Sequence, residues 1–354
     1  MKKLFLILLV LNVAACSLPA GTPTPAMSLP TPTFVPSMTP FAPPQGEVTL
    51  APSITPVATE ELGVWDMPYS IPSLRRRTYD SRTWEINSVQ DGGEITYASF
   101  TYPSDGLNIY GRMSIPAGEG PFPVIIAIHG YNPIESYSTP DYAIDEFDGL
   151  VREGYIVIHP NLRNYPPSDE GDNLYRVGMS IDVLNLLEVV KAQAGQEGAL
   201  AKADSTRLGL WAHSMGGEIA LRALTISPDV DAALLYAPLG GDTLQNSRLL
   251  YQLTPISPFD EEINTPQAQL TGIAPMYYFV NIPPTTAIRL FHGSDDGIVP
   301  VTVSVTTCDL LKGLGKNIEC TFVPDQGHTF RSSYSPTYRA EMYAFYETYL
   351  KNAQ

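Results

Sequence analysis

The chain has 354 residues, of which 44% are hydrophobic and 16% charged. This length and composition allow one large globular domain or two small ones. The formal net charge of −16 argues against nucleic acid as a partner, because binding to phosphates relies on clustered Lys and Arg.

The first sixteen residues have the features of a targeting segment. A basic start precedes an apolar run over residues 4–10, and small residues then lead into Cys16. The run is too short to span a bilayer, which needs about 20 residues. The segment resembles a bacterial lipoprotein signal, in which the cysteine is acylated. We therefore expect a signal peptide over residues 1–16, lipidation of Cys16 and an extracytoplasmic protein anchored to a bacterial membrane. A plain secretory signal is the alternative.

A Pro- and Thr-rich segment follows the targeting segment. Its prolines recur from Pro19 to Pro56, and Glu47 is the one charged residue between residues 17 and 59. Such a composition cannot bury enough apolar surface to fold, and proline favours extended backbone. We expect a disordered spacer over residues 17–62 and a catalytic domain over residues 63–354.

Strand and helix patterns alternate beyond the spacer. Residues 94–102 and 107–115 flank a turn and predict a hairpin. Further strands are expected at 123–128, 155–159, 208–212, 232–236, 287–291 and 318–323. Helices are expected at 142–153, 176–193, 215–225, 301–314 and 337–350. This order predicts an α/β fold with a mostly parallel sheet of about eight strands and helices on both faces. Residues 240–284 interrupt the alternation and predict a lid or cap insertion.

Ser214 lies where a predicted strand gives way to a predicted helix. The surrounding residues follow the pattern G-x-S-x-G, with Ala212 in place of the first glycine. A tight turn from strand to helix exposes a serine oxygen for attack on a carbonyl. The sequence therefore predicts Ser214 as the nucleophile of a serine hydrolase.

A base must take the proton of the serine, and in this fold it follows the nucleophile and the acid along the chain. Four of the five histidines do not meet this order: His129, His159, His213 and His292. His328 follows an acid and stands in the loop after the last predicted strand. We predict His328 as the base.

The acid is expected after the penultimate strand, where the chain matches the pattern H-G-x-x-D-x-x-V-P. The pattern places the carboxylate on Asp296, and Asp295 is the alternative. Its role is to hold the imidazole in one tautomer. An oxyanion needs two backbone N–H donors. We expect these from Met215 and from Tyr131, which follows the first buried strand.

The stretch from Tyr102 to His328 resembles the catalytic domain of the prolyl oligopeptidase and dienelactone hydrolase branches of the α/β-hydrolase superfamily. The likeness rests on the residues around Tyr102, the His-Gly loop at 129, the serine turn, residues 292–300 and Gly327-His328. Peptidases of that family carry Tyr where this chain has Met215. Their large β-propeller is also not expected, since only about 30 residues precede the hairpin. His-Ser-Met-Gly-Gly together with Tyr131 is similar to secreted bacterial esterases and cutinase-like polyester hydrolases.

These observations favour hydrolysis of a small carboxylic ester through an acyl-enzyme. A peptidase of the prolyl oligopeptidase type acting on short peptides is one alternative, and an inactive membrane-tethered binding lipoprotein is another. No metal or organic cofactor is expected, because the chain has neither Cys/His ligand spacing nor a phosphate-binding loop with a partner Lys. We expect the insertion and the loops after Tyr131 and Asn161 to form the substrate pockets. The sequence leaves open whether Cys308 and Cys320 form a disulfide and what the oligomeric state is.

Overall fold

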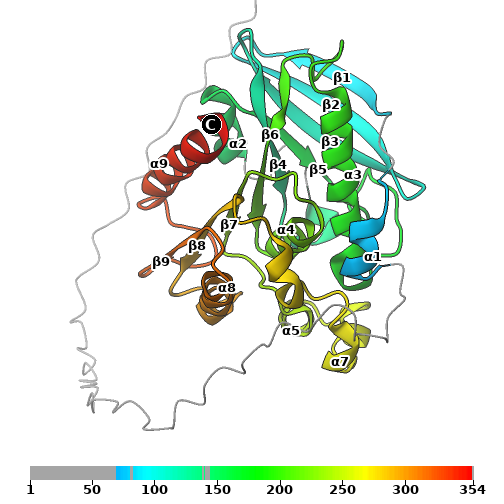
Figure 1. Cartoon of the computed structure of the whole chain (residues 1–354), viewed down its shortest axis with the longest axis vertical. Coiled ribbons are helices and arrows are strands. Elements are labelled where there is room, and N and C mark those ends of the chain that lie inside the picture. The colour runs from blue at the N-terminus through cyan, green and yellow to red at the C-terminus, as the bar shows by residue number, and fades with distance from the viewer. Residues whose placement is uncertain (1–68, 80–82, 138, 140–143, 353–354) are drawn as a thin grey trace, which may run out of the picture. The chain divides into compact units, whose positions relative to one another are not determined.

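The structure is a computed structural model that describes residues 69–79, 83–137, 139 and 144–352 (Figure 1). The predicted signal peptide, Cys16, the spacer over residues 17–62 and the start of the catalytic domain at residue 63 lie outside these residues. All described residues belong to one compact unit, Ile54–Gln354. Among them, no helix combines the length and the apolar character needed to span a membrane.

A nine-stranded sheet forms the centre of the described part of the chain (Figure 1). Its order is β1-β2-β3-β5-β4-β6-β7-β8-β9, antiparallel from β1 through β3 to β5 and parallel from β5 onward. The strands are β1 (Glu85–Asp91), β2 (Ile95–Ser104), β3 (Leu107–Pro116), β4 (Phe122–Ile128), β5 (Ile156–Pro160), β6 (Ala203–His213), β7 (Ala232–Tyr236), β8 (Ala287–Gly293) and β9 (Ile318–Val323). The predicted α/β fold with a mostly parallel sheet is confirmed.

The sheet has one strand more than the eight that the sequence predicts. The extra strand is β1, whose sequence EINSVQD is almost wholly exposed. Edge strands of this kind lack the alternation of apolar and polar residues that marks a half-buried strand. The central strands differ because both of their faces are covered, and β5 and β7 are buried at every position.

Helices cover both faces of the sheet (Figure 1). On β4, Ile126 joins the core beneath one set of helices and Ile125 joins the core beneath the other, because successive side chains of a strand point to opposite faces. The first set comprises α1 (Ile71–Arg76), α3 (Val177–Gln193), α4 (Met215–Ile226) and α8 (Val301–Gly313). The second comprises α2 (Ile144–Arg152), α9 (Ser335–Tyr346) and the last turn, η4 (Glu347–Lys351).

The predicted insertion lies between β7 and β8 and is built from short helices. It contains α5 (Thr243–Leu253), α6 (Phe259–Glu262), α7 (Gln267–Leu270) and η3 (Pro275–Asn281). Two further 3-10 turns, η1 (Ile134–Ser136) and η2 (Leu174–Arg176), follow β4 and precede α3. The insertion and both turns lie on the side of the sheet where its parallel strands end, which is where α/β proteins place their sites.

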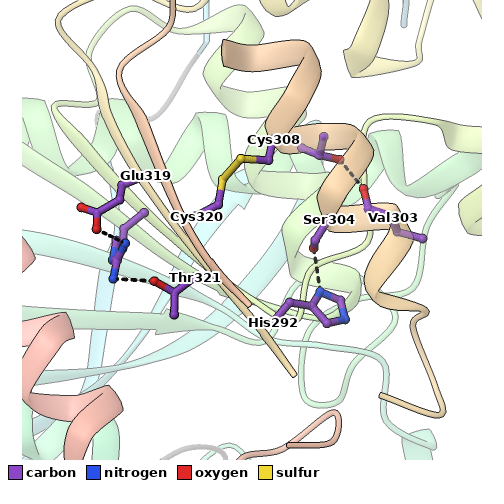
Figure 2. Close-up of a disulfide and its surroundings, with 9 residues drawn as sticks. His292, Val303, Ser304, Cys308, Glu319, Cys320 and Thr321 are labelled. Atoms are coloured by element: carbon purple, nitrogen blue, oxygen red, sulfur yellow. Dashed lines mark hydrogen bonds and ion pairs between the residues drawn. A yellow bond between two sulfur atoms is a disulfide. The ribbon is translucent and has the colours of Figure 1, made fainter. Parts of the chain in front are cut away.

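Cys308 and Cys320 form a disulfide, which resolves the question that the sequence leaves open (Figure 2). Cys308 lies on α8 and Cys320 on the edge strand β9. The cross-link therefore attaches the last covering helix on this face to the last strand of the sheet.

Loss of this disulfide is expected to lower the free energy of unfolding. The bond closes a loop with a sequence separation of 12, and a loop of this length corresponds to about 3 kcal/mol of lost chain entropy in the unfolded state. Equilibrium urea unfolding of a Cys308→Ser/Cys320→Ser variant measures the effect. Dithiothreitol should shift the wild type toward the variant and leave the variant unchanged. Equal urea midpoints for the wild type and the variant, both measured without dithiothreitol, would contradict the expectation.

Candidate active site

Ser214 occupies the sharp turn between β6 and α4. Its backbone has φ 55° and ψ −120°, a conformation that non-glycine residues rarely adopt. The turn is held by a hydrogen bond from the Ser214 N–H to the Tyr236 carbonyl, at 3.1 Å. This is the strained strand-to-helix geometry that presents a serine oxygen at the end of a sheet.

Gly216 allows the start of α4 to lie directly against the end of β4. A Cβ atom at this position would stand 2.5 Å from the carbonyl oxygen of Ile128, which is far inside contact distance. Because the two backbones touch, the first residue of α4, Met215, is brought next to the loop that follows β4. Ala212, which replaces the usual glycine, is fully buried and pairs with Ile128 in the sheet.

The structure brings together the three side chains that the sequence singles out. The Oγ of Ser214 lies 2.9 Å from Nε2 of His328, and Nδ1 of His328 lies 2.7 Å from Oδ2 of Asp296. The three residues follow β6, β9 and β8 respectively. Asp295 instead is exposed and accepts a hydrogen bond from Ser294 at 2.9 Å. Of the two candidate carboxylates, Asp296 is therefore the one that contacts His328.

Asp296 is held on both of its oxygens. Its Oδ1 accepts from the backbone N–H groups of Ile298 and Val299, at 2.8 and 2.9 Å. Its Oδ2 lies 3.0 Å from Nε2 of His292, in addition to His328. Burial favours the protonated acid, but the hydrogen bonds from His292, His328 and Val299 outweigh it and lower the pKa of Asp296 well below its ordinary value. The group is therefore a carboxylate at neutral pH.

His292 is a residue of the site that the sequence reasoning assigned no role. It is fully buried on β8, and its Nδ1 lies 2.6 Å from Oγ of Ser304 on α8 (Figure 2). Its Nε2 also approaches the carbonyl of Val299 at 2.9 Å. The signal that could have found it is the first letter of the same H-G-x-x-D pattern that identified Asp296.

The other three histidines are neutral at pH 7. Burial, with the nearby His129, lowers the pKa of His159 to about 3. Burial, with the nearby His328, lowers the pKa of His213 to about 3 as well. Burial also lowers the pKa of His129, whose ring stacks edge-on against Tyr165 beside the loop after β4.

Two backbone N–H groups are available beside Ser214. Met215 is the first residue of α4, and N–H groups of the first turn have no acceptor within their own helix. Tyr131 follows β4, and no acceptor for its N–H is found among the described residues. The loop that carries Tyr131 is fixed by Tyr165, whose hydroxyl lies 3.2 Å from both N and O of Asn132. Preorganised donors of this kind stabilise a developing oxyanion.

A cavity of about 650 Å³ opens beside these donors. Its wall includes the insertion, the segment after Tyr131 and the loop after Asn161, which are the segments expected from the sequence to form the substrate pockets. Much of the lining is apolar, from Tyr131, Ile134, Tyr165, Met179, Met215 and Phe259. Phe259 of the insertion packs edge-on against Tyr131, with ring centroids 5.9 Å apart. Among the described residues, no group of three or more His, Cys, Asp or Glu side chains is arranged to hold a metal ion.

Comparison with known proteins finds both esterases and peptidases among the similar chains. A provisionally named carboxymethylenebutenolidase of Methylorubrum extorquens is 26% identical over 245 residues, which cover 67% of this chain and 72% of that protein. Acetyl xylan esterase 1 from Thermoanaerobacterium sp. JW/SL YS485 superposes with a TM-score of 0.58 at 17% identity, covering 78% of this chain and 91% of that one. The acylaminoacyl peptidase of Pyrococcus horikoshii gives a TM-score of 0.56 at 20% identity, covering 75% of this chain but 43% of that one.

The two structural neighbours share the α/β-hydrolase fold with this chain. Residues 146–353, more than half of the chain, match the prolyl oligopeptidase family. They include every element from β5 to the last turn, and with them Ser214, Asp296 and His328. The chain therefore belongs to the prolyl oligopeptidase family and is a serine hydrolase.

Proposed function

We propose that this protein hydrolyses a carboxylic ester through an acyl-enzyme. The observation that carries the proposal is the unbroken line of contacts from Ser214 Oγ to His328 Nε2 and from His328 Nδ1 to Asp296 Oδ2, at 2.9 and 2.7 Å. Nucleophile, base and acid all stand within the hydrogen-bond reach that such catalysis needs.

The geometry supports a reaction in two halves. Ser214 Oγ bonds to the ester carbonyl carbon while its proton passes to His328 Nε2, and the carbonyl oxygen becomes an oxyanion facing the N–H groups of Met215 and Tyr131. The C–O bond to the alcohol then breaks, and His328 returns the proton to the leaving alcohol. Water attacks the acyl-enzyme with His328 again as base, which releases the acid and restores Ser214. Asp296 remains ionised and holds Nδ1–H of the imidazole throughout.

Two observations favour an ester over a peptide. Met215 stands where peptidases of the family carry tyrosine. The similar proteins also include a carboxymethylenebutenolidase and an acetyl xylan esterase by name. A short peptide is the second candidate, supported by the family match and by the structural likeness to an acylaminoacyl peptidase.

A fluorophosphonate probe and two substrate series test the proposal. We expect the probe to label Ser214, identified by mass spectrometry of the tryptic peptide, and p-nitrophenyl acyl esters to be hydrolysed faster than aminoacyl p-nitroanilides. Faster cleavage of the anilides would establish the peptidase instead. A folded protein that neither reacts with the probe nor hydrolyses either series would be the inactive binding lipoprotein.

We further propose that the chain is exported and anchored to a bacterial membrane through a lipid on Cys16, with residues 17–62 as a spacer and residues 63–354 as the catalytic domain. The support is the sequence pattern alone. Metabolic labelling with a palmitate analogue, compared between wild type and Cys16→Ser, tests the anchor. Equal labelling of the two proteins would refute it.

A further inference from the structure

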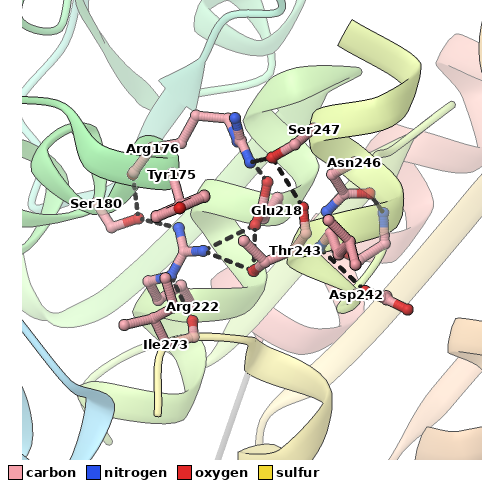
Figure 3. A network of polar contacts seen from close by, with 12 residues as sticks. Tyr175, Arg176, Ser180, Glu218, Arg222, Asp242, Thr243, Asn246, Ser247 and Ile273 are labelled. Atoms are coloured by element: carbon pink, nitrogen blue, oxygen red, sulfur yellow. Dashed lines mark hydrogen bonds and ion pairs between the residues drawn. The ribbon is translucent and has the colours of Figure 1, made fainter. Parts of the chain in front are cut away.

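A buried group of two arginines and two glutamates adjoins the cavity, and Figure 3 shows three of its members, Arg176, Glu218 and Arg222. Arg176 binds Glu218 through Nε and Glu262 through Nη1, each at 2.7 Å. Arg222 binds the other oxygen of Glu218 at 2.8 Å. All four side chains are at most 2% exposed. Two positive and two negative charges cancel, so this buried quartet carries no net charge.

Arg176 alone among the quartet lines the cavity, together with Met215 and Phe259. Each of its three nitrogens is already engaged, because Nη2 donates to Oγ of Ser247 at 2.9 Å. Burial opposes the charged form, but Glu218 and Glu262 outweigh it and raise the pKa of Arg176 above its ordinary value. The cavity wall therefore holds a guanidinium cation whose charge is balanced by carboxylates and whose three nitrogens each donate to a protein oxygen.

Glu262 fixes this arrangement from the insertion. Its Oε2 binds Arg176 and accepts from Ser247 at 2.6 Å, while its Oε1 accepts from the backbone N–H of Tyr175 at 3.0 Å. Tyr175 and Arg176 both have left-handed backbones, with φ 49° and 63°, which non-glycine residues adopt only when the surroundings require it. The Glu262 carboxylate thus holds the backbone of Tyr175 and the side chain of Arg176.

The loop after β5 adds negative charge to the same cavity. Glu170 and Asp172 line it and are exposed, and no ion pair joins either side chain to another described residue. A carboxylate in the substrate would therefore meet two like charges and a cation that is already neutralised. An uncharged apolar group would meet Tyr131, Met179 and Phe259.

We propose that Glu262 is a specificity-determining residue, which by neutralising Arg176 makes the cavity select esters with an uncharged apolar acyl group and reject esters whose acyl group carries a carboxylate. The inference rests on the proposed ester hydrolysis. Arg176 is in this view a masked anion-binding group, and Glu262 is the group that masks it.

A matched pair of esters tests the selectivity of the wild type. p-Nitrophenyl hexanoate and mono-p-nitrophenyl adipate have six-carbon acyl chains and differ in the terminal carboxylate. After correction for their alkaline hydrolysis rates, we expect kcat/KM to favour the hexanoate by about 10-fold or more, as expected for two like charges near the acyl chain. At 1 M NaCl the hexanoate-to-adipate ratio of kcat/KM should fall toward one, because salt screens the exposed carboxylates of Glu170 and Asp172.

Replacement of Glu262 by glutamine tests the masking. The amide keeps the shape of the side chain and removes its charge, which leaves Arg176 in excess. We expect the adipate-to-hexanoate ratio of kcat/KM to rise by about 10-fold in Glu262→Gln. Glu261→Gln removes the same charge from the neighbouring exposed position of α6 and should leave the ratio unchanged. An Arg176→Gln/Glu262→Gln variant should not show this rise in the ratio, because it also lacks the arginine cation.

Each outcome decides between the proposals. A wild type that hydrolyses both esters alike overturns the inference and leaves the esterase in place, whereas a wild type that hydrolyses neither and resists the fluorophosphonate overturns the esterase itself. Thermal melting shows whether Glu262→Gln is folded. A folded variant with an unchanged ratio refutes the role of Glu262. If the variant does not fold, the wild-type ratio and its response to salt decide.

Discussion

Replacement of Ser214 by alanine is expected to lower kcat for p-nitrophenyl ester hydrolysis by about 10⁶-fold. In the proposed mechanism Ser214 Oγ forms the acyl bond, and its contact with His328 Nε2 at 2.9 Å is the path by which its proton leaves. Without it, a water molecule must attack with no covalent intermediate. The N–H groups of Met215 and Tyr131 remain in the variant, so a small rate above the uncatalysed reaction should persist. Initial rates at saturating ester measure the loss.

The control for this variant is Ser88→Ala, which removes a hydroxyl from the exposed edge strand β1. Its kcat should equal that of the wild type. Near-ultraviolet circular dichroism should show the same fold for all three proteins, since Ser214 Oγ makes no contact that the core depends on. Retention of more than about one hundredth of the activity in Ser214→Ala would remove this residue from the mechanism.

Replacement of Asp296 by asparagine is expected to lower kcat by about 10⁴-fold while the fold is retained. The backbone N–H groups of Ile298 and Val299 require an acceptor at the position of Oδ1, so the amide oxygen must take that place. The amide NH₂ then faces Nδ1 of His328. Because NH₂ donates, Nδ1 must accept, and the proton of the imidazole moves to Nε2. A protonated Nε2 cannot take the proton of Ser214.

Asp295→Asn is the matched control, since it makes the same chemical change one residue earlier at an exposed side chain. Its kcat is expected to stay within about twofold of the wild type, as for surface substitutions in general. A larger loss for Asp295→Asn than for Asp296→Asn would reassign the acid to Asp295. The fluorophosphonate labelling rate of Ser214 should fall in parallel with kcat in Asp296→Asn, because the probe depends on the same base.

The three residues of the site could be predicted from sequence because each lies in the turn or loop that follows a strand. Ser214, Asp296 and His328 follow β6, β8 and β9, and parallel strands bring their carboxyl ends to one edge of the sheet. Apolar runs identify such strands without knowledge of the rest of the fold. The edge strand β1 escapes the same reasoning because it is exposed.

The environment of the site could not be predicted in this way. The contact between Arg176 and Glu262 joins residues 86 positions apart and depends on how the insertion folds back over α3. The left-handed backbone at Tyr175 and Arg176 has no local sequence signal, since neither is a glycine. His292 differs from these residues because a sequence pattern does mark it. It is the first residue of H-G-x-x-D-x-x-V-P, but the pattern was used to identify Asp296 and not the histidine that contacts it.

The contact at Gly216 has a consequence for laboratory evolution of substrate range. Any side chain at residue 216 would collide with the backbone at the end of β4. Variants at this codon are therefore expected to lose the serine turn, so a library gains nothing by varying it. Residues 256–259 of the insertion also border the cavity, but they belong to a segment of short helices outside the sheet. New specificities are therefore most accessible by sampling these four codons with the serine turn kept as it is.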